Sequence, residues 1–139
     1  MSIKKDAQTA HANLLEKTDP EALERINHFA FDEVQADVDL PDRTKMLSTL
    51  AYLLGMQGVD EYKVMLPVAL DNGVSPVEAK EVLYQAVDYL GLGRVFPFFN
   101  ATNDVLRARG VEMPLPSQSI TTMDNRLEKG EETQIRLFG

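Results

Sequence analysis

The sequence contains no cysteine, and its 139 residues include only two histidines, His11 and His28. Without cysteine, disulfides, zinc sites with thiolate ligands and thiol redox cycles are all excluded. Two imidazoles are too few for a His-rich metal site. We therefore expect the protein to hold no metal and no cofactor.

Positive charge is scarce as well. The sequence has 14 Lys and Arg residues and 22 Asp and Glu residues, which gives a formal net charge of −8. Such a surface repels phosphate backbones and anionic membranes, so we expect neither nucleic acid nor membrane as a partner. No apolar run approaches the roughly 20 residues that a membrane span needs, and the N-terminal sequence is polar, unlike a signal peptide. These features predict a cytoplasmic protein.

The chain has the length of one ordinary domain, long enough to bury a core. Apolar residues recur at spacings of three and four, and no useful strand alternation is present. The pattern predicts an all-α helical bundle with six or seven helices. We expect a single domain over residues 1–139, made of N-terminal helices at 5–36, a central part at about 42–110 and a C-terminal extension at 111–139.

The clearest punctuation lies in the stretch Gly55–Arg94. Asp71-Asn72-Gly73 ends a helix predicted over about residues 60–70. Ser75-Pro76-Val77-Glu78 then combines a hydroxyl cap, a proline in the first turn and a carboxylate three residues after the cap. This is a capping box, and it predicts a helix over about residues 76–90. Two helices joined by so short a turn are antiparallel and pack together.

Similar signals define the other helices. Thr18-Asp19-Pro20-Glu21 repeats the capping-box pattern, and Gly91 with Gly93 ends the helix that begins at Pro76. The remaining helices are predicted over about residues 5–16, 20–36, 42–56, 94–110 and 123–138.

The central part, about residues 42–110, resembles the carboxymuconolactone decarboxylase family, which includes thiol peroxidases of the alkylhydroperoxidase D type. It shares with that family a helix that ends in Asn-Gly-Val, a capped helix of the type Glu-Val-Leu and a Tyr-x-Gly helix end. The residues that carry the resemblance are Gly55, Glu61, 69–78, 81–83 and 86–91.

The resemblance implies an all-α bundle that forms homo-oligomers, as trimers or hexamers, with sites near the start of the helix at residues 60–70. The tail at 113–122, followed by residues 126–130, is similar to that of a subgroup in which one chain often carries two such units. The present chain resembles the N-terminal unit of that subgroup, and a homologous second unit is therefore an expected partner.

The reactive groups of the family are missing here. The two cysteine positions of the peroxidases correspond to Gly58 and Glu61, their histidine to Met65, and their glutamate falls at or next to Met46. The same resemblance implies that the decarboxylases of the family have one histidine at the position of Met65 and another near that of Gln85. Peroxide reduction needs a thiolate, and a thioether or amide cannot transfer protons as imidazole does. These differences argue against peroxidase activity and against the ordinary decarboxylase mechanism.

The remaining candidates for acid or base catalysis are Glu61 and Asp60. A carboxylate beside a buried apolar surface can transfer protons. The alternative is that both simply favour a helix N-terminus. Arg94 is a candidate for binding a substrate carboxylate, with an interface salt bridge as its alternative role.

Five further residues are candidates for substrate binding. Tyr84, Gln85 and Tyr89 would line a pocket, although Tyr89 also fits a core aromatic with its hydroxyl at the surface. Met65 would form an apolar pocket wall or belong to the core. His28 is the last candidate, and a structural role is its alternative.

Two functions follow. The first is a lyase-like enzyme of the resembled family that acts on a small carbonyl, lactone or carboxylate substrate without thiol chemistry, with Glu61 as acid or base and Arg94 as anchor. The second is a catalytically degenerate, oligomer-forming subunit that pairs with an active homologous unit. The apolar residues at the end of the sequence, Ile135, Leu137 and Phe138, favour the second.

Overall fold

The computed structural model describes residues 3–139, and within that range every regular element is a helix. Because α2, η1 and α3 follow one another without a break, the described chain has seven helical segments, which confirms the predicted all-α fold. The elements are α1 (Ile3–Leu15), α2 (Pro20–Asn27), η1 (His28–Val34), α3 (Gln35–Asp37), α4 (Asp42–Gly55), α5 (Val59–Asp71), α6 (Pro76–Leu90), α7 (Leu92–Ala108) and α8 (Arg126–Phe138).

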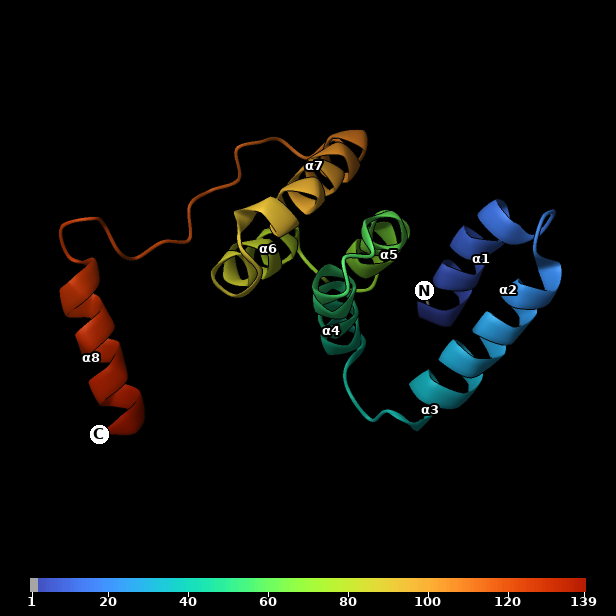
Figure 1. The fold of residues 1–139 in the computed structure, drawn as a ribbon, viewed down its shortest axis with the longest axis horizontal. Helices are drawn as coiled ribbons and strands as arrows, with labels where there is room; N and C mark the ends of the chain where they lie inside the picture. The colour runs from blue at the N-terminus through green and yellow to red at the C-terminus, as the bar shows by residue number, and fades with distance from the viewer. Residues whose placement is uncertain (1–2) are drawn as a thin grey trace.

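Four helices form the body of the protein (Figure 1). Helix α4 packs beside α5 and α6, and α7 packs beside the same two helices, so the four enclose a common core. Each contributes apolar side chains one turn apart, as an amphipathic helix should. The fully or almost fully buried members of this core are Met46, Leu50, Leu54, Leu66, Ala69, Ala79, Leu83, Val95, Phe98 and Ala101.

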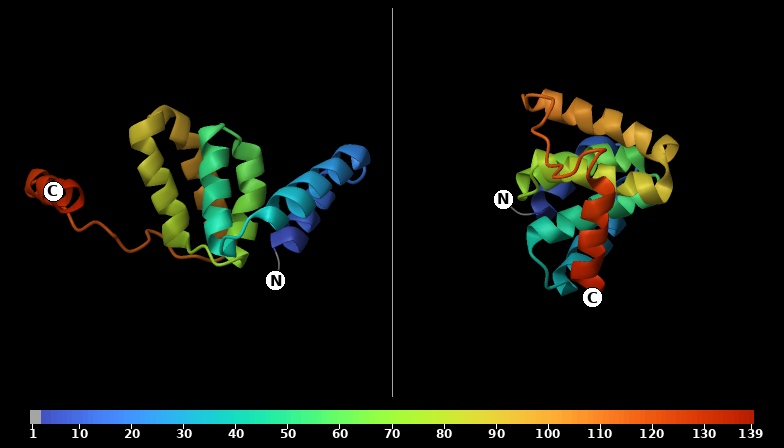
Figure 2. Two further views of the ribbon diagram at one scale, coloured as in Figure 1. Left: turned by 90° about the horizontal axis from the view of Figure 1, so that it is seen from below. Right: turned by 90° about the vertical axis from the view of Figure 1, so that its left-hand side faces the viewer.

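Helices α1 and α2 lie on one side of this body, where α1 packs against α5 (Figures 1 and 2). Ile3, Ala7 and His11 form the buried stripe of α1. The element that follows α2, η1, is a π-helix, a wider turn that the sequence did not reveal. It places Phe31 in the core, with its ring centroid 6.5 Å from that of His11.

The turn between α5 and α6 has the predicted structure. The backbone N–H of Glu78 donates to Ser75 Oγ at 3.2 Å, and the backbone N–H of Ser75 donates to Glu78 Oε2 at 2.9 Å. Both bonds of the capping box are therefore present. Gly73 has φ of +97°, a left-handed conformation that favours glycine.

Two local predictions were wrong. Asp19 precedes α2 but makes no side-chain cap bond, and Glu21 is engaged by Arg25 at 2.7 Å rather than by the backbone, so no capping box forms there. Helix α6 ends at Gly91 alone, with φ of +80°, and α7 begins at once with Leu92. Gly93 therefore lies in the first turn of α7 instead of ending α6.

The C-terminal part has a different character. Residues 109–125 contain no regular helix, and α8 beyond them lies apart from the body (Figure 2). None of the residues of α8 is buried. Within residues 3–139, none of the helices combines the length and the apolar character that crossing a membrane would require.

Helix α5 is anchored to α7 by a buried polar contact. Tyr62 is fully buried, its hydroxyl lies 3.0 Å from Thr102 Oγ1, and its ring meets Phe98 edge-on at 5.1 Å. Burial raises the pKa of Tyr62 above its ordinary value, although the hydrogen bond to Thr102 opposes this. A raised pKa in the folded state means that the unfolded chain ionises first as the pH rises.

We predict that Tyr62→Phe lowers the free energy of unfolding by about 1 kcal/mol at pH 7, because the Thr102 hydroxyl loses its partner. The stability that the protonated Tyr62 hydroxyl contributes is fully present below its unfolded pKa of 10.0. It is lost as the pH rises through the higher pKa of the folded state. Urea unfolding should therefore show a smaller loss of stability above pH 10 for Tyr62→Phe than for wild type. The exposed Tyr52→Phe variant is the control. Equal alkaline losses in wild type and Tyr62→Phe would contradict the prediction.

Candidate functional site

A pairing of an imidazole with a carboxylate joins α1 to α5. His11 Nε2 lies 2.6 Å from Glu61 Oε1, across 50 positions of sequence. The two partners differ in access to solvent, since the side chain of His11 is 9% exposed and that of Glu61 is 42% exposed. A buried imidazole thus lies behind a carboxylate that solvent and small molecules can reach.

The second ring nitrogen of His11 adds to this chemistry. Nδ1 is buried and has no hydrogen-bond partner among the described residues. When Nε2–H donates to the Glu61 carboxylate, Nδ1 of the neutral ring keeps a free lone pair. The buried ring therefore holds the carboxylate through the Nε2–Oε1 hydrogen bond alone. No group of three or more His, Asp or Glu side chains suited to a metal occurs within residues 3–139.

The neighbours of Glu61 on α5 have different surroundings. Asp60 has a side chain that is 95% exposed and pairs only with Lys63, at 3.4 Å. Met65 is 4% exposed and belongs to the core, as does Met46, which is fully buried. Of the two predicted carboxylates, Glu61 alone has an imidazole partner. The core alternative for Met65 agrees with its burial.

The remaining predicted residues do not gather around Glu61. Arg94 is exposed in the first turn of α7. His28 is exposed on η1, where its Nδ1 lies 2.9 Å from Glu33 Oε1. Within one chain the structure therefore brings neither Arg94 nor His28 to the His11–Glu61 pair.

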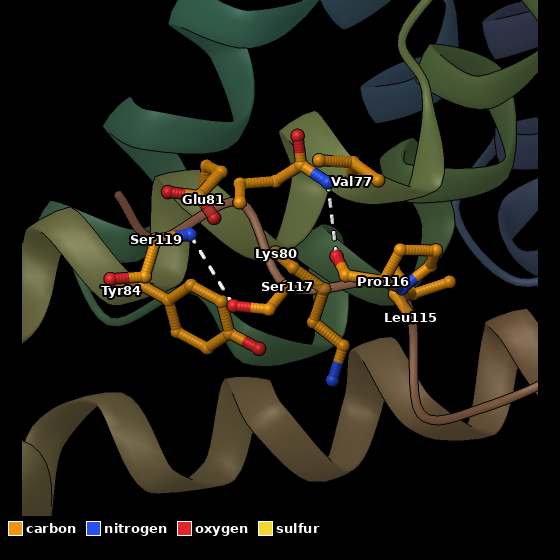
Figure 3. Close-up of a pocket in the computed structure, with 9 residues that line it drawn as sticks. Val77, Lys80, Glu81, Tyr84, Leu115, Pro116, Ser117 and Ser119 are labelled. Atoms are coloured by element: carbon orange, nitrogen blue, oxygen red, sulfur yellow. Dashed lines mark hydrogen bonds between the residues drawn. The ribbon is translucent and has the colours of Figure 1, made fainter. Parts of the chain in front are cut away.

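Tyr84 lines a pocket of about 460 Å³ on the other side of the body, between α6 and residues 115–119 (Figure 3). This segment is ordered by its own contacts, because Gln118 Nε2 donates to the Pro116 carbonyl at 3.0 Å. From α6 the pocket receives Val77, Lys80, Glu81 and Tyr84. We call it the linker pocket.

Lys80 was not singled out from the sequence, yet it is the cation of the linker pocket. Its amine donates to Asn103 Oδ1 and lies 5.8 Å from the centroid of the Phe99 ring. Partial burial lowers the pKa of Lys80 below its ordinary value, and the positive charge of Arg107 lowers it further. Its side chain is thus held by α7 instead of extending into solvent.

Gln85 and Tyr89 line a third feature, an apolar groove of about 460 Å³ between α4 and α6. Its walls are mainly Leu47, Ala51, Val82 and Ala86, with Arg43, Glu78 and Glu81 beside them. Arg43 forms an ion pair with Glu78 across the groove. Although Tyr89 lines this groove, it is 86% exposed and is not a core aromatic. We call this feature the α4–α6 groove.

Sequence reasoning found Glu61 but missed His11. The two residues come from different helices, and nothing in local spacing links them. The only available signal was the position of His11 in the stripe Ile3–Ala7–His11, which predicts that it faces the same neighbour as the apolar residues of α1.

Comparison with known proteins agrees with the fold and turn motifs. The model of the carboxymuconolactone decarboxylase family matches residues 20–104. A 4-carboxymuconolactone decarboxylase from Acinetobacter baylyi is 31% identical over 86 residues, which are 62% of this chain and 64% of that protein. The present chain thus spans slightly less than two thirds of the length of this relative. The matched region runs from the start of α2 into α7 and includes the capped turn between α5 and α6. The chain belongs to the carboxymuconolactone decarboxylase family.

Proposed function

We propose that this protein is a lyase-like enzyme that acts on a small carbonyl, lactone or carboxylate substrate without thiol chemistry, with Glu61 as its acid or base. The observation that carries the proposal is the 2.6 Å contact between His11 Nε2 and Glu61 Oε1. The similarity to a 4-carboxymuconolactone decarboxylase supports the substrate class. We keep the cytoplasm, expected from the sequence, as its location.

The chemistry of such a substrate suits one carboxylate with an imidazole behind it. When a carboxylated lactone loses CO₂, the C–C bond breaks and its electron pair passes to the neighbouring unsaturated carbonyl as an enolate. A general acid must then protonate carbon. Glu61 is accessible enough to touch the substrate, whereas His11 is buried and acts as a positioning residue that holds Glu61.

Assembly of several copies is part of the same proposal. Arg94 is exposed and has no hydrogen bond or ion pair with Glu61 or His11 within residues 3–139, so its predicted role in substrate binding requires groups from different surfaces to meet. A homo-oligomer, a trimer or a hexamer, brings the surface of one copy to the site of another. The Arg94 guanidinium then has the geometry to hold a substrate carboxylate through two hydrogen bonds.

We predict that Glu61→Gln lowers kcat/KM for 4-carboxymuconolactone by about 10²–10⁴, the usual effect of losing a general acid or base. The measurement is release of CO₂ with the loss of lactone absorbance. His11→Gln, which keeps a hydrogen-bond donor beside Glu61, should lower kcat less and shift the pH–rate profile. Asp60→Asn is the matched control, because the Asp60 carboxylate is 95% exposed on the same turn.

Two results would contradict this role. Full activity of Glu61→Gln, in a variant whose circular dichroism and unfolding midpoint match wild type, would remove Glu61 from the chemistry. Equal losses in Glu61→Gln and Asp60→Asn would indicate a general effect of charge at the start of α5.

A second candidate function is favoured by the burial of Met46 and Met65. By resemblance the reactive glutamate of the family falls at or next to Met46 and its histidine at Met65, but here the two methionines are 0% and 4% exposed, within the core. Their thioethers contribute packing and carry no proton. In this alternative the chain is a catalytically degenerate subunit that stabilises and pairs with an active homologous unit.

Coexpression with a homologous unit that carries the missing Cys and His residues separates the two functions. The subunit function predicts that the two chains copurify, that the activity of the homologous unit rises in the complex, and that Glu61→Gln leaves this activity unchanged. The enzyme function predicts turnover by the present chain alone and its loss in Glu61→Gln. Absence of copurification would count against the subunit function.

A further inference from the structure

Helix α8 has an apolar face with no partner in the described structure. Leu127, Ile135, Leu137 and Phe138 are all exposed, and no residue of the helix is buried. The four lie on one broad side of α8, because positions 127 and 138 are three turns apart and 135 and 137 flank the line between them. In Figures 1 and 2 the helix lies well away from α4–α7.

Such a helix needs a surface to pack against. It has 13 residues, and isolated helices of this length are marginal in water even with strong helix formers. Gly130, in its second turn, weakens it further by roughly 1 kcal/mol relative to alanine. Burial of the apolar face is therefore the interaction that can stabilise α8 as a helix.

The α4–α6 groove offers the complementary surface. Leu47, Ala51, Val82 and Ala86 give it apolar walls, and grooves between two helices commonly receive a third, amphipathic helix. Glu81 borders the groove and has no ion pair among the described residues. Arg126 and Arg136 of α8 likewise have none within residues 3–139, so the charged margins of the two surfaces can pair.

Charge also favours α8 as the occupant. The helix carries three basic residues (Arg126, Lys129 and Arg136) and three acidic ones (Glu128, Glu131 and Glu132), so its formal charge is zero. The whole chain carries −8. Two acidic bodies repel each other, whereas a charge-balanced helix meets no such net repulsion when it approaches an acidic body.

The path of the linker indicates which copy provides the groove. Residues 115–119 lie against α6 in the linker pocket (Figure 3). There the amine of Lys80 donates to Asn103 of α7. The groove is on the α4 side of the same helix. To reach it, α8 would have to turn back across α6. Because residues 115–119 lie against α6, only residues 120–125 link the linker pocket to α8, and they span roughly 20 Å when extended. So short a link favours the groove of a neighbouring molecule over a return across α6.

We propose that α8 of one copy docks in the α4–α6 groove of a second copy of this chain, so that each subunit gives a helix and receives one. The exchange couples subunits through two different surfaces, α8 of one copy and the groove of the other. It does not depend on the His11–Glu61 pair, which lies between α1 and α5. The role of Glu61 as acid or base, which Glu61→Gln tests, and the docking of α8 can therefore fail separately.

Because the native chain has no cysteine, engineered cysteines can test this contact. One protein carries Leu127→Cys on the apolar side of α8, and a second, distinguished by a mass tag, carries Ala51→Cys in the groove. The two are mixed as full-length chains in a glutathione redox buffer. We expect a disulfide-linked heterodimer at a yield about tenfold or more above that of a mixture in which Lys129→Cys replaces Leu127→Cys, because docking raises the effective concentration of one pair only. Lys129 lies on the side of α8 opposite Leu127 and is the matched control.

Sedimentation of the cysteine-free chain provides the second measurement. Leu127→Asp with Leu137→Asp should reduce the assembly toward monomers, and Ala51→Glu should do the same from the groove side. Three outcomes would overturn the proposal: equal cross-linking by Leu127→Cys and Lys129→Cys, a monomeric wild-type chain, or, in a variant that carries both Leu127→Cys and Ala51→Cys, a disulfide formed only within that chain. The last would place α8 in its own groove.

Discussion

The burial of α5 is the constraint on which the rest of the structure depends. This helix packs against α1, α4 and α7, and five of its side chains are buried. Few positions on such a helix remain free for chemistry. Met65 fills the core, Tyr62 is fixed by Thr102, and Asp60 faces solvent without a functional partner. Glu61 alone lies at the margin, close enough to α1 to contact an imidazole and exposed enough to reach a ligand.

Polar contacts of the turn after α5 connect this helix to α1 and to the residue that follows α7. Asn72 donates through its side-chain amide to Asp6 of α1 at 3.1 Å and to the Val68 carbonyl at 2.8 Å. Asp71 forms an ion pair with Arg109 beyond α7, which draws the C-terminal end of α7 toward the same turn. The residues through which the sequence resembled its family are thus also those that hold the bundle together. A scaffold can keep them while its reactive groups change.

The sequence predicted most of the fold because its signals were local. The capping box at Ser75, the Asn-Gly turn and the apolar periodicity placed α5 and α6 within one residue of their observed ends. Prediction failed where the outcome depended on competition or distance. Glu21 had a basic partner, Arg25, one turn away, and that contact replaced the expected cap. The π-helical turn at 28–34 likewise had no local signal.

The candidate site was harder to predict than the fold. Glu61 could be found from its place at a helix start, but His11 lies 50 positions away and meets it only after α1 has packed on α5. Arg94 and Tyr89 followed a familiar pattern of anchors and pocket walls, but both are exposed, Tyr89 beside the α4–α6 groove and Arg94 in the first turn of α7. Local spacing predicts which residues share a helix face, and it cannot predict which faces meet.

The candidate acid–base pair and the proposed association surfaces lie in different parts of the molecule. The acid–base pair lies where α1 meets α5, whereas the α4–α6 groove and the apolar side of α8 lie elsewhere. The His11–Glu61 pair between α1 and α5 is partly exposed, so its charge contributes little to stability. The buried apolar residues Ile3 and Ala7 hold α1 in place instead. A substitution at Glu61 can consequently change proton transfer while the bundle and its association surfaces remain intact.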